Sequence, residues 1–131
     1  MCVVLNEETR EMKWPIHVTY HTSTGKTGSF VFSSGQFEDL QLDLEEDEAV
    51  WFNKDMLGFY LPLPTPEYFQ DKILPKISQF SDADQFGILF MVSKTFDLAS
   101  QKEVLPMFRN CKSLAVKYLS DDMSNKIQLQ Y

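Results

Sequence analysis

The chain has only two histidines, His17 and His21, spaced four residues apart. On a helix, that spacing would let both imidazoles reach one metal ion. However, Ile16, Val18 and Tyr20 alternate with them, which predicts a strand. On a strand the two rings share one face but lie roughly 13 Å apart, at ~3.3 Å per residue, so they cannot bind the same ion. We therefore expect solvent-facing histidines, and neither a metal nor a cofactor.

Gly25, Lys26 and Thr27 match the end of a phosphate-binding loop. The full motif needs a glycine five residues earlier, where the chain has Tyr20, and a helix afterwards. The next segment, 29–32, instead has alternating apolar residues, which predict a strand. Gly25 and Gly28 suit a hairpin turn that joins this strand to 16–20.

Asp43, Glu45 and Asp47 match the first ligands of a calcium-binding loop. The glycine required at the sixth position is Glu48, and the glutamate required at the twelfth is Lys54. We therefore expect no calcium site of this type.

Cys111 is a candidate nucleophile, and its neighbours Arg109 and Lys112 could lower its pKa. Nothing in the sequence places a histidine beside it as a base, and cysteine is often simply a small buried residue. The reactivity of Cys111 stays open, and no catalytic constellation emerges. We expect that the protein is not an enzyme.

The most unusual segment is 36–52, in which acids alternate with Leu40, Leu42 and Leu44. It contains no lysine or arginine, and its seven acids equal the net charge of the whole chain, −7. The alternation predicts a strand, an acidic turn and a second strand at 49–52. A helix over 37–48 is the alternative. The acids are Glu38, Asp39, Asp43, Glu45, Glu46, Asp47 and Glu48.

Aromatic residues follow the acids, among them Trp51, Phe59 and Tyr60. Acidic charge beside exposed aromatic side chains is typical of a surface that docks a basic protein. We expect the acids and these aromatics to form a partner-binding site of an inhibitor, an immunity-type neutraliser or an adaptor. The alternatives are an enzyme or small-ligand-binding domain with a scattered site, and an inhibitor that mimics DNA.

Charge and composition limit the classes of partner that the protein can bind. A pI near 4.7 argues against binding nucleic acid or an anionic membrane surface. No apolar run is long enough to span a membrane, and the N-terminus does not match a signal peptide. The two cysteines, Cys2 and Cys111, are then expected as reduced thiols of a cytoplasmic protein.

The remaining pattern predicts more strands than helices. Further strands are expected at 2–5, 57–61, 86–92, 114–119 and 126–131, with 86–92 central in the sheet. A helix bent at Pro75 is expected over 66–80, and a shorter one, opened by a capping box of Ser100 and Glu103, through residue 108. Residues 81–84 are expected as a linker.

These elements predict an α+β (mixed α/β) fold with a largely antiparallel sheet of about six to eight strands and two helices. The N-terminal half is strand-rich, and the order α-β-α-β-β comes after it. At 131 residues we expect a single domain over 1–131, in which the proline-rich segment 61–66 is a seam. The last strand, 126–131, could pair with a second copy and form a homodimer.

Overall fold

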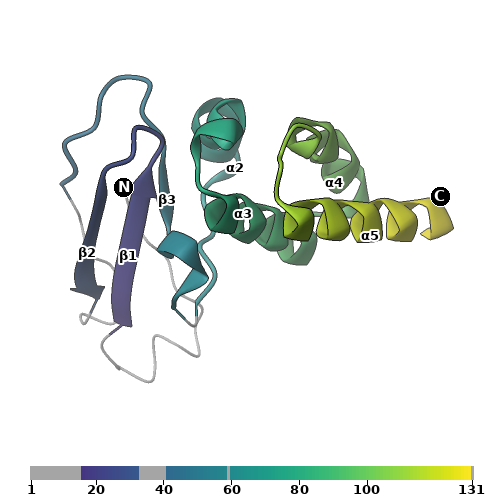
Figure 1. Cartoon of the computed structure of the whole chain (residues 1–131), viewed down its shortest axis with the longest axis horizontal. Coiled ribbons are helices and arrows are strands. Elements are labelled where there is room, and N and C mark those ends of the chain that lie inside the picture. Colours follow the sequence, from purple (N-terminus) through teal and green to yellow (C-terminus); the bar gives the residue numbers. More distant parts are fainter. Residues whose placement is uncertain (1–15, 33–40, 59, 131) are drawn as a thin grey trace.

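The computed structural model describes residues 16–32, 41–58 and 60–130. Within them the chain is α+β, with a three-stranded antiparallel sheet followed by a group of helices (Figure 1). The strands are β1 (Ile16–Thr22), β2 (Thr27–Phe32) and β3 (Val50–Phe52), and β1 lies in the middle. The mixed class is therefore confirmed.

The predicted hairpin is confirmed. β1 pairs with β2 from Ile16 opposite Phe32 to His21 opposite Thr27. Gly25 lies in the connecting turn with φ 95°, a conformation that glycine adopts without strain. The Gly-Lys-Thr sequence is thus part of a hairpin turn and the strand after it.

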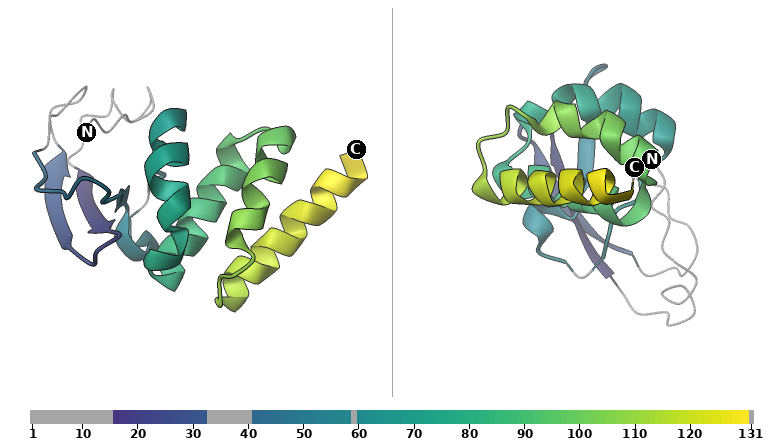
Figure 2. Two further views of the ribbon diagram at one scale, coloured as in Figure 1. Left: turned by 90° about the horizontal axis from the view of Figure 1, so that it is seen from above. Right: turned by 90° about the vertical axis from the view of Figure 1, so that its right-hand side faces the viewer.

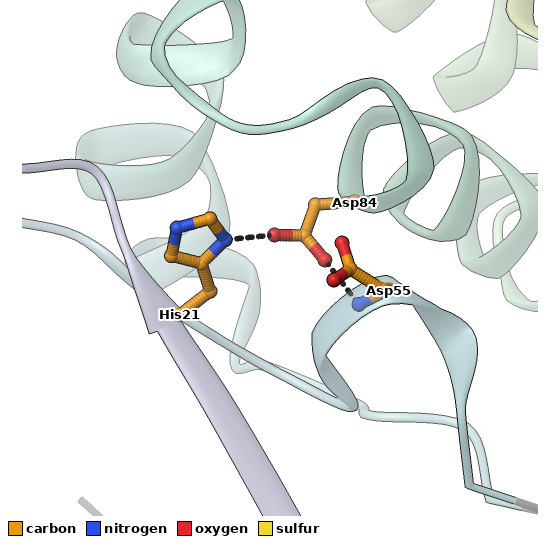
Figure 3. A group of neighbouring side chains, drawn as sticks. All are labelled: His21, Asp55 and Asp84. Carbon is orange, nitrogen blue, oxygen red and sulfur yellow. Dashed lines mark hydrogen bonds and ion pairs between the residues drawn. The ribbon is translucent and has the colours of Figure 1, made fainter. Parts of the chain in front are cut away.

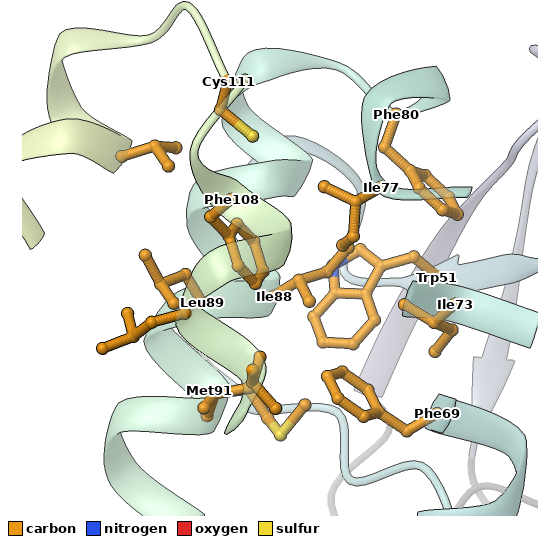
Figure 4. Close-up of a cluster of buried hydrophobic side chains, with 14 of the residues drawn as sticks. Trp51, Phe69, Ile73, Ile77, Phe80, Ile88, Leu89, Met91, Phe108 and Cys111 are labelled. Atoms are coloured by element: carbon orange, nitrogen blue, oxygen red, sulfur yellow. The ribbon is translucent and has the colours of Figure 1, made fainter. Parts of the chain in front are cut away.

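Two clusters of apolar side chains lie on opposite faces of the sheet, and β3 contributes side chains to both clusters. Val50 and Phe52 pack with Val18 and Phe32 on one face. Trp51 points to the other face, into the larger cluster formed with the helices (Figure 4). Strand alternation thus connects two cores through three consecutive residues.

The helical part follows β3 in the chain, and its helices lie to one side of the sheet (Figure 2). A 3₁₀ turn, η1 (Lys54–Met56), is followed by α2 (Pro66–Tyr68), the π-helical η2 (Phe69–Ile73) and the 3₁₀ η3 (Leu74–Gln79). The three segments after η1 are the helix expected over 66–80. The remaining elements are α3 (Asp82–Thr95), α4 (Leu98–Val104), η4 (Leu105–Phe108) and α5 (Leu114–Gln130).

The prediction of a central strand at 86–92 is wrong, because this segment lies within α3. Ser81 caps the helix, accepting a hydrogen bond from the Asp84 backbone N–H, so 81–84 is a helix start and not a linker. Gly87, Ile88, Leu89, Met91 and Val92 are all buried. A helix enclosed on most sides gives the same continuous apolar run as a strand buried on both faces.

The strands predicted at 114–119 and 126–131 are also wrong as far as residue 130, because α5 covers 114–130. Val116, Met123 and Ile127 are buried, at helical spacing, whereas Leu129 is 86% exposed. The homodimer expected from a terminal strand thereby loses its basis, because the paired groups of a helix backbone offer no sheet edge.

The sheet of six to eight strands with two helices is therefore corrected to three strands and four α-helices within the described ranges. The described residues of 57–61 form no strand, and 2–5 lies outside these ranges. Helix α4 is capped by Asp97, whose side chain accepts from the Ser100 backbone N–H, and not by the expected box at Ser100. None of the described helices combines the length and apolarity needed to cross a bilayer.

Candidate functional site

The acidic segment forms a loop, residues 41–49, that leads into β3 and that we call the acidic loop. Four of its acids are exposed: Asp43, Glu45, Glu46 and Asp47. Leu42 and Leu44 between them are half-buried and pack against the core cluster of Val18 and its neighbours. The predicted alternation of wet and buried side chains is confirmed here, but residues 41–45 form no strand. Glu38 and Asp39 lie outside the described residues.

Glu48 differs from the other acids of the loop because its side chain is completely buried. Its carboxylate accepts hydrogen bonds from the hydroxyl of Thr24, from the backbone N–H of Glu45 at 3.0 Å and from Lys26 Nζ at 3.3 Å. The hydroxyls of Thr22 and Thr24, followed by the Glu45 N–H, lower the pKa of Glu48 from 4.5 to about 2. Glu48 therefore organises the loop from inside and is not free to contact a partner.

Further contacts fix the acidic loop to its neighbours. The Ala49 backbone N–H donates to Ser23 Oγ at 3.1 Å, and the Ser23 N–H donates to the Ala49 carbonyl at 2.9 Å. Lys26 Nζ donates to the Asp43 carbonyl at 3.2 Å, and Lys72 Nζ on η2 donates to the Glu46 carbonyl at 3.0 Å. Both lysines thus hold backbone oxygens of the loop.

The exposed carboxylates are not neutralised by these lysines. The ion pair at the loop joins Lys26 to the buried Glu48, at 3.3 Å. Within the described ranges, the side chains of Asp43, Glu45, Glu46 and Asp47 form no ion pair with a lysine, arginine or histidine. Four negative charges are therefore presented to solvent on a short, hydrogen-bonded loop.

The predicted aromatic anchors do not accompany these acids as exposed groups. Trp51 is 2% exposed and belongs to the core (Figure 4), so it cannot serve as a surface anchor. Tyr60 is half-buried, its hydroxyl accepts from the Thr19 backbone N–H at 3.2 Å, and burial raises its pKa. Phe59 lies outside the described residues. Sequence reasoning placed these aromatics at the surface because strand alternation does not tell which face a helix will cover.

A second cluster of titratable groups lies where the sheet meets the helices (Figure 3). His21 at the end of β1 contacts Asp84 on α3, with 2.7 Å between His21 Nδ1 and Asp84 Oδ2. The other carboxylate oxygen of Asp84 accepts from the Asp55 backbone N–H at 2.8 Å. The Asp55 carboxylate accepts from Ser81 Oγ at 3.0 Å. His21 is therefore not the solvent-facing residue that was expected, whereas His17 is exposed.

The ligand atoms of His21, Asp55 and Asp84 lie within 4.8 Å of one another, so these residues could hold a divalent cation. A tetrahedral ion with bonds near 2 Å separates its ligand atoms by roughly 3.3 Å, so the contact of 2.7 Å would have to open. Without an ion, both oxygens of the buried Asp84 carboxylate already have partners. This cluster can therefore act as a hydrogen-bonded junction between β1, η1 and α3.

The junction is not arranged as a catalytic triad. Among the described residues, no serine, threonine or cysteine side chain hydrogen-bonds to His21, and the hydroxyl of Ser81 is directed to Asp55. Sequence reasoning missed the junction because His21 and Asp84 are separated by 63 positions. No local pattern marks such a pair.

Cys111 is buried, with 5% of its surface exposed. Burial, followed by the nearby charge of Asp82, raises the pKa of its thiol. The sequence had suggested the opposite shift from Arg109 and Lys112, and both of these residues are exposed. A raised pKa keeps the thiol protonated, which does not fit a nucleophile.

No protein-family model matches the chain, and a search of curated proteins finds no match.

Proposed function

We propose that the protein acts by binding a basic protein partner through the acidic loop, as an inhibitor, an immunity-type neutraliser or an adaptor. The observation that carries this proposal is a group of four exposed acids that form no ion pair within the described part of the chain. They lie on a loop whose backbone is fixed by Glu48, Lys26, Lys72 and Ser23. A loop already held in one conformation loses little conformational entropy when it binds.

The charges of the acidic loop would attract and orient a basic partner, but would contribute little to affinity. Exposed ion pairs contribute only about 0.2–1 kcal/mol each, so their main effect is to attract and orient a cationic partner. Affinity must then come from other contacts around the loop, because Leu42 and Leu44 pack against the core cluster and leave only part of their surface exposed. Binding of this kind weakens as salt screens the charges.

We also propose a cytoplasmic location. Within the described residues, Cys111 is a buried thiol that forms no disulfide, as is usual for proteins of reducing compartments.

The experiment compares what two versions of the chain capture from a lysate of the source organism. The loop variant carries Asp43→Asn, Glu45→Gln, Glu46→Gln and Asp47→Asn. We expect a basic protein captured by the wild-type chain to be lost from the loop variant. Its capture by wild type should also fall as salt rises from about 0.05 M to about 0.5 M, as measured by quantitative mass spectrometry.

A charge-matched variant serves as the control. It removes four exposed acids elsewhere, by Glu67→Gln, Asp82→Asn, Glu103→Gln and Asp121→Asn. We expect this variant to keep the captured protein, because its acidic loop is intact. Equal capture by the loop variant and wild type, or equal loss from both variants, would contradict binding through the acidic loop.

A further inference from the structure

Among the described residues, the indole N–H of Trp51 has no hydrogen-bond partner, although Trp51 is 2% exposed. Nearly all buried N–H groups in proteins have a partner, because an unpaired one loses its hydration without compensation. An indole N–H can only donate, so its missing partner must be an acceptor. This atom therefore requires an explanation.

A cavity of about 310 Å³ is lined by Trp51 and lies between the residues after β3 and helix α3. Its walls are mainly apolar, with Met56, Leu61 and Phe90 among the lining side chains. The volume lies at the lower end of the range for small-molecule sites, ~300–1,000 Å³. An apolar cavity with very few polar groups is the usual form of such a site.

Gly87 keeps this cavity open beside the Trp51 N–H. A Cβ atom at Gly87 would lie 3.5 Å from Trp51 Nε1 and 3.1 Å from Met56 Cγ, so it would occupy the space next to both. Glycine is unfavourable inside a helix such as α3, where alanine is the best residue. The bare backbone at this position thus leaves room for an atom in front of the indole nitrogen.

The other polar side chains of the cavity are already engaged. The Asn53 amide donates to the carbonyls of Gly58 and Tyr60 and accepts from the Gly58 N–H. The Tyr60 hydroxyl accepts from the Thr19 N–H. Among the described residues, no charged side chain lines the cavity. A ligand that fits this cavity must therefore offer a hydrogen-bond acceptor to the Trp51 N–H.

We infer that this cavity binds a small, uncharged, largely apolar molecule that carries a carbonyl or ether oxygen, and that this oxygen accepts the Trp51 N–H. The absence of charged lining groups excludes an ionic ligand, because a buried charge would stay unpaired there. The site is distinct from the acidic loop, so it does not depend on the proposed protein partner.

The test uses the full chain with Trp14→Phe, which leaves Trp51 as the source of the indole N–H signal in a ¹H–¹⁵N NMR spectrum. The probes are acetophenone, a neutral aryl ketone, and cumene, which has a similar shape and no acceptor. We expect acetophenone to shift the Trp51 N–H signal in a saturable way. It should bind about tenfold more tightly than cumene, because it satisfies the donor.

Gly87→Ala in the same background blocks the space in front of the indole nitrogen. We expect acetophenone to bind at least about tenfold more weakly. Because the new Cβ lies 3.1 Å from Met56 Cγ, the better helix propensity of alanine keeps or raises the melting temperature only if the Met56 side chain shifts. Ala83→Ser, at an exposed position of the same helix, should leave the affinity unchanged. If Gly87→Ala fails to fold, Trp51→Phe takes its place, and ligand-observed NMR should then give equal affinities for the two probes.

Each of the following results would overturn the inference. The first is the absence of a saturable shift, and the second is equal binding of acetophenone and cumene by the Trp14→Phe protein. The third is unchanged acetophenone affinity in a folded Gly87→Ala protein, or a preserved preference for acetophenone in Trp51→Phe.

Discussion

Glu48 and its acidic neighbours have opposite roles in one short loop. The side chain of Glu48 is buried and accepts hydrogen bonds from Thr24, Glu45 and Lys26, whereas Glu46 presents its side chain to solvent. The buried carboxylate fixes the loop, and the exposed ones give it charge. Glu48 therefore shapes the surface that a partner would contact, but Glu48 itself would not touch the partner.

Glu48→Gln should lower the urea midpoint of unfolding at pH 7, because a neutral amide is a weaker acceptor for Lys26 and the hydroxyl donors. Folding lowers the pKa of Glu48 from 4.5 to about 2, so its stabilising effect is complete above about pH 4.5 and is lost as the pH falls towards 2. The difference between wild type and Glu48→Gln should shrink over this interval, as measured by urea titration at several pH values.

Glu46→Gln is the matched control, since Glu46 is exposed in the same loop. It should leave the urea midpoint nearly unchanged at every pH. A midpoint that Glu48→Gln does not lower at pH 7, or a difference that persists at pH 2, would show that the buried carboxylate does not organise the loop.

The sequence predicts the charge of the acidic loop, but not which acid is buried. Glu45, Glu46 and Glu48 are chemically identical, and only the positions of Thr22, Thr24 and Lys26 in the neighbouring hairpin select Glu48. That selection depends on how segments distant in the chain pack together. The contact between His21 and Asp84 was missed for the same reason.

At the level of the elements, hydrophobic periodicity predicts the hairpin and the helical segment over 66–79 but fails for α3 and α5. The apolar run in α3 has no polar face, because the helix is packed on most sides. In α5, Ile127 and Leu129 imitate the alternation of a strand, although a helix places them on different faces. Local pattern alone does not separate these possibilities.

Alanine substitutions at these two positions distinguish a helix from a strand. Ile127 is 6% exposed and Leu129 is 86% exposed. Ile127→Ala should lower the free energy of unfolding by about 2 kcal/mol or more, and Leu129→Ala by less than about 0.5 kcal/mol, as measured by urea denaturation. Similar losses at both positions would support the strand and contradict α5.

On the scale of the whole molecule, the acidic loop and α5 lie at opposite ends (Figure 1). The acidic loop lies beside the sheet and packs on the smaller apolar cluster, whereas α5 contributes Val116, Met123 and Ile127 to the larger one. Of the seven acids expected in a partner-binding site, Asp43, Glu45, Glu46 and Asp47 are found exposed at this end of the molecule. A partner that docks on the acidic loop should leave α5 uncovered.

A site-specific photo-crosslinker tests this arrangement most directly. Gln41 is an exposed, uncharged residue of the acidic loop, and Gln128 is an exposed, uncharged residue of α5. With the crosslinker at position 41, irradiation in the source cells should produce a covalent adduct with the basic protein that the wild-type chain captures, and at position 128 it should not. An adduct from position 128 without one from position 41 would contradict docking on the acidic loop.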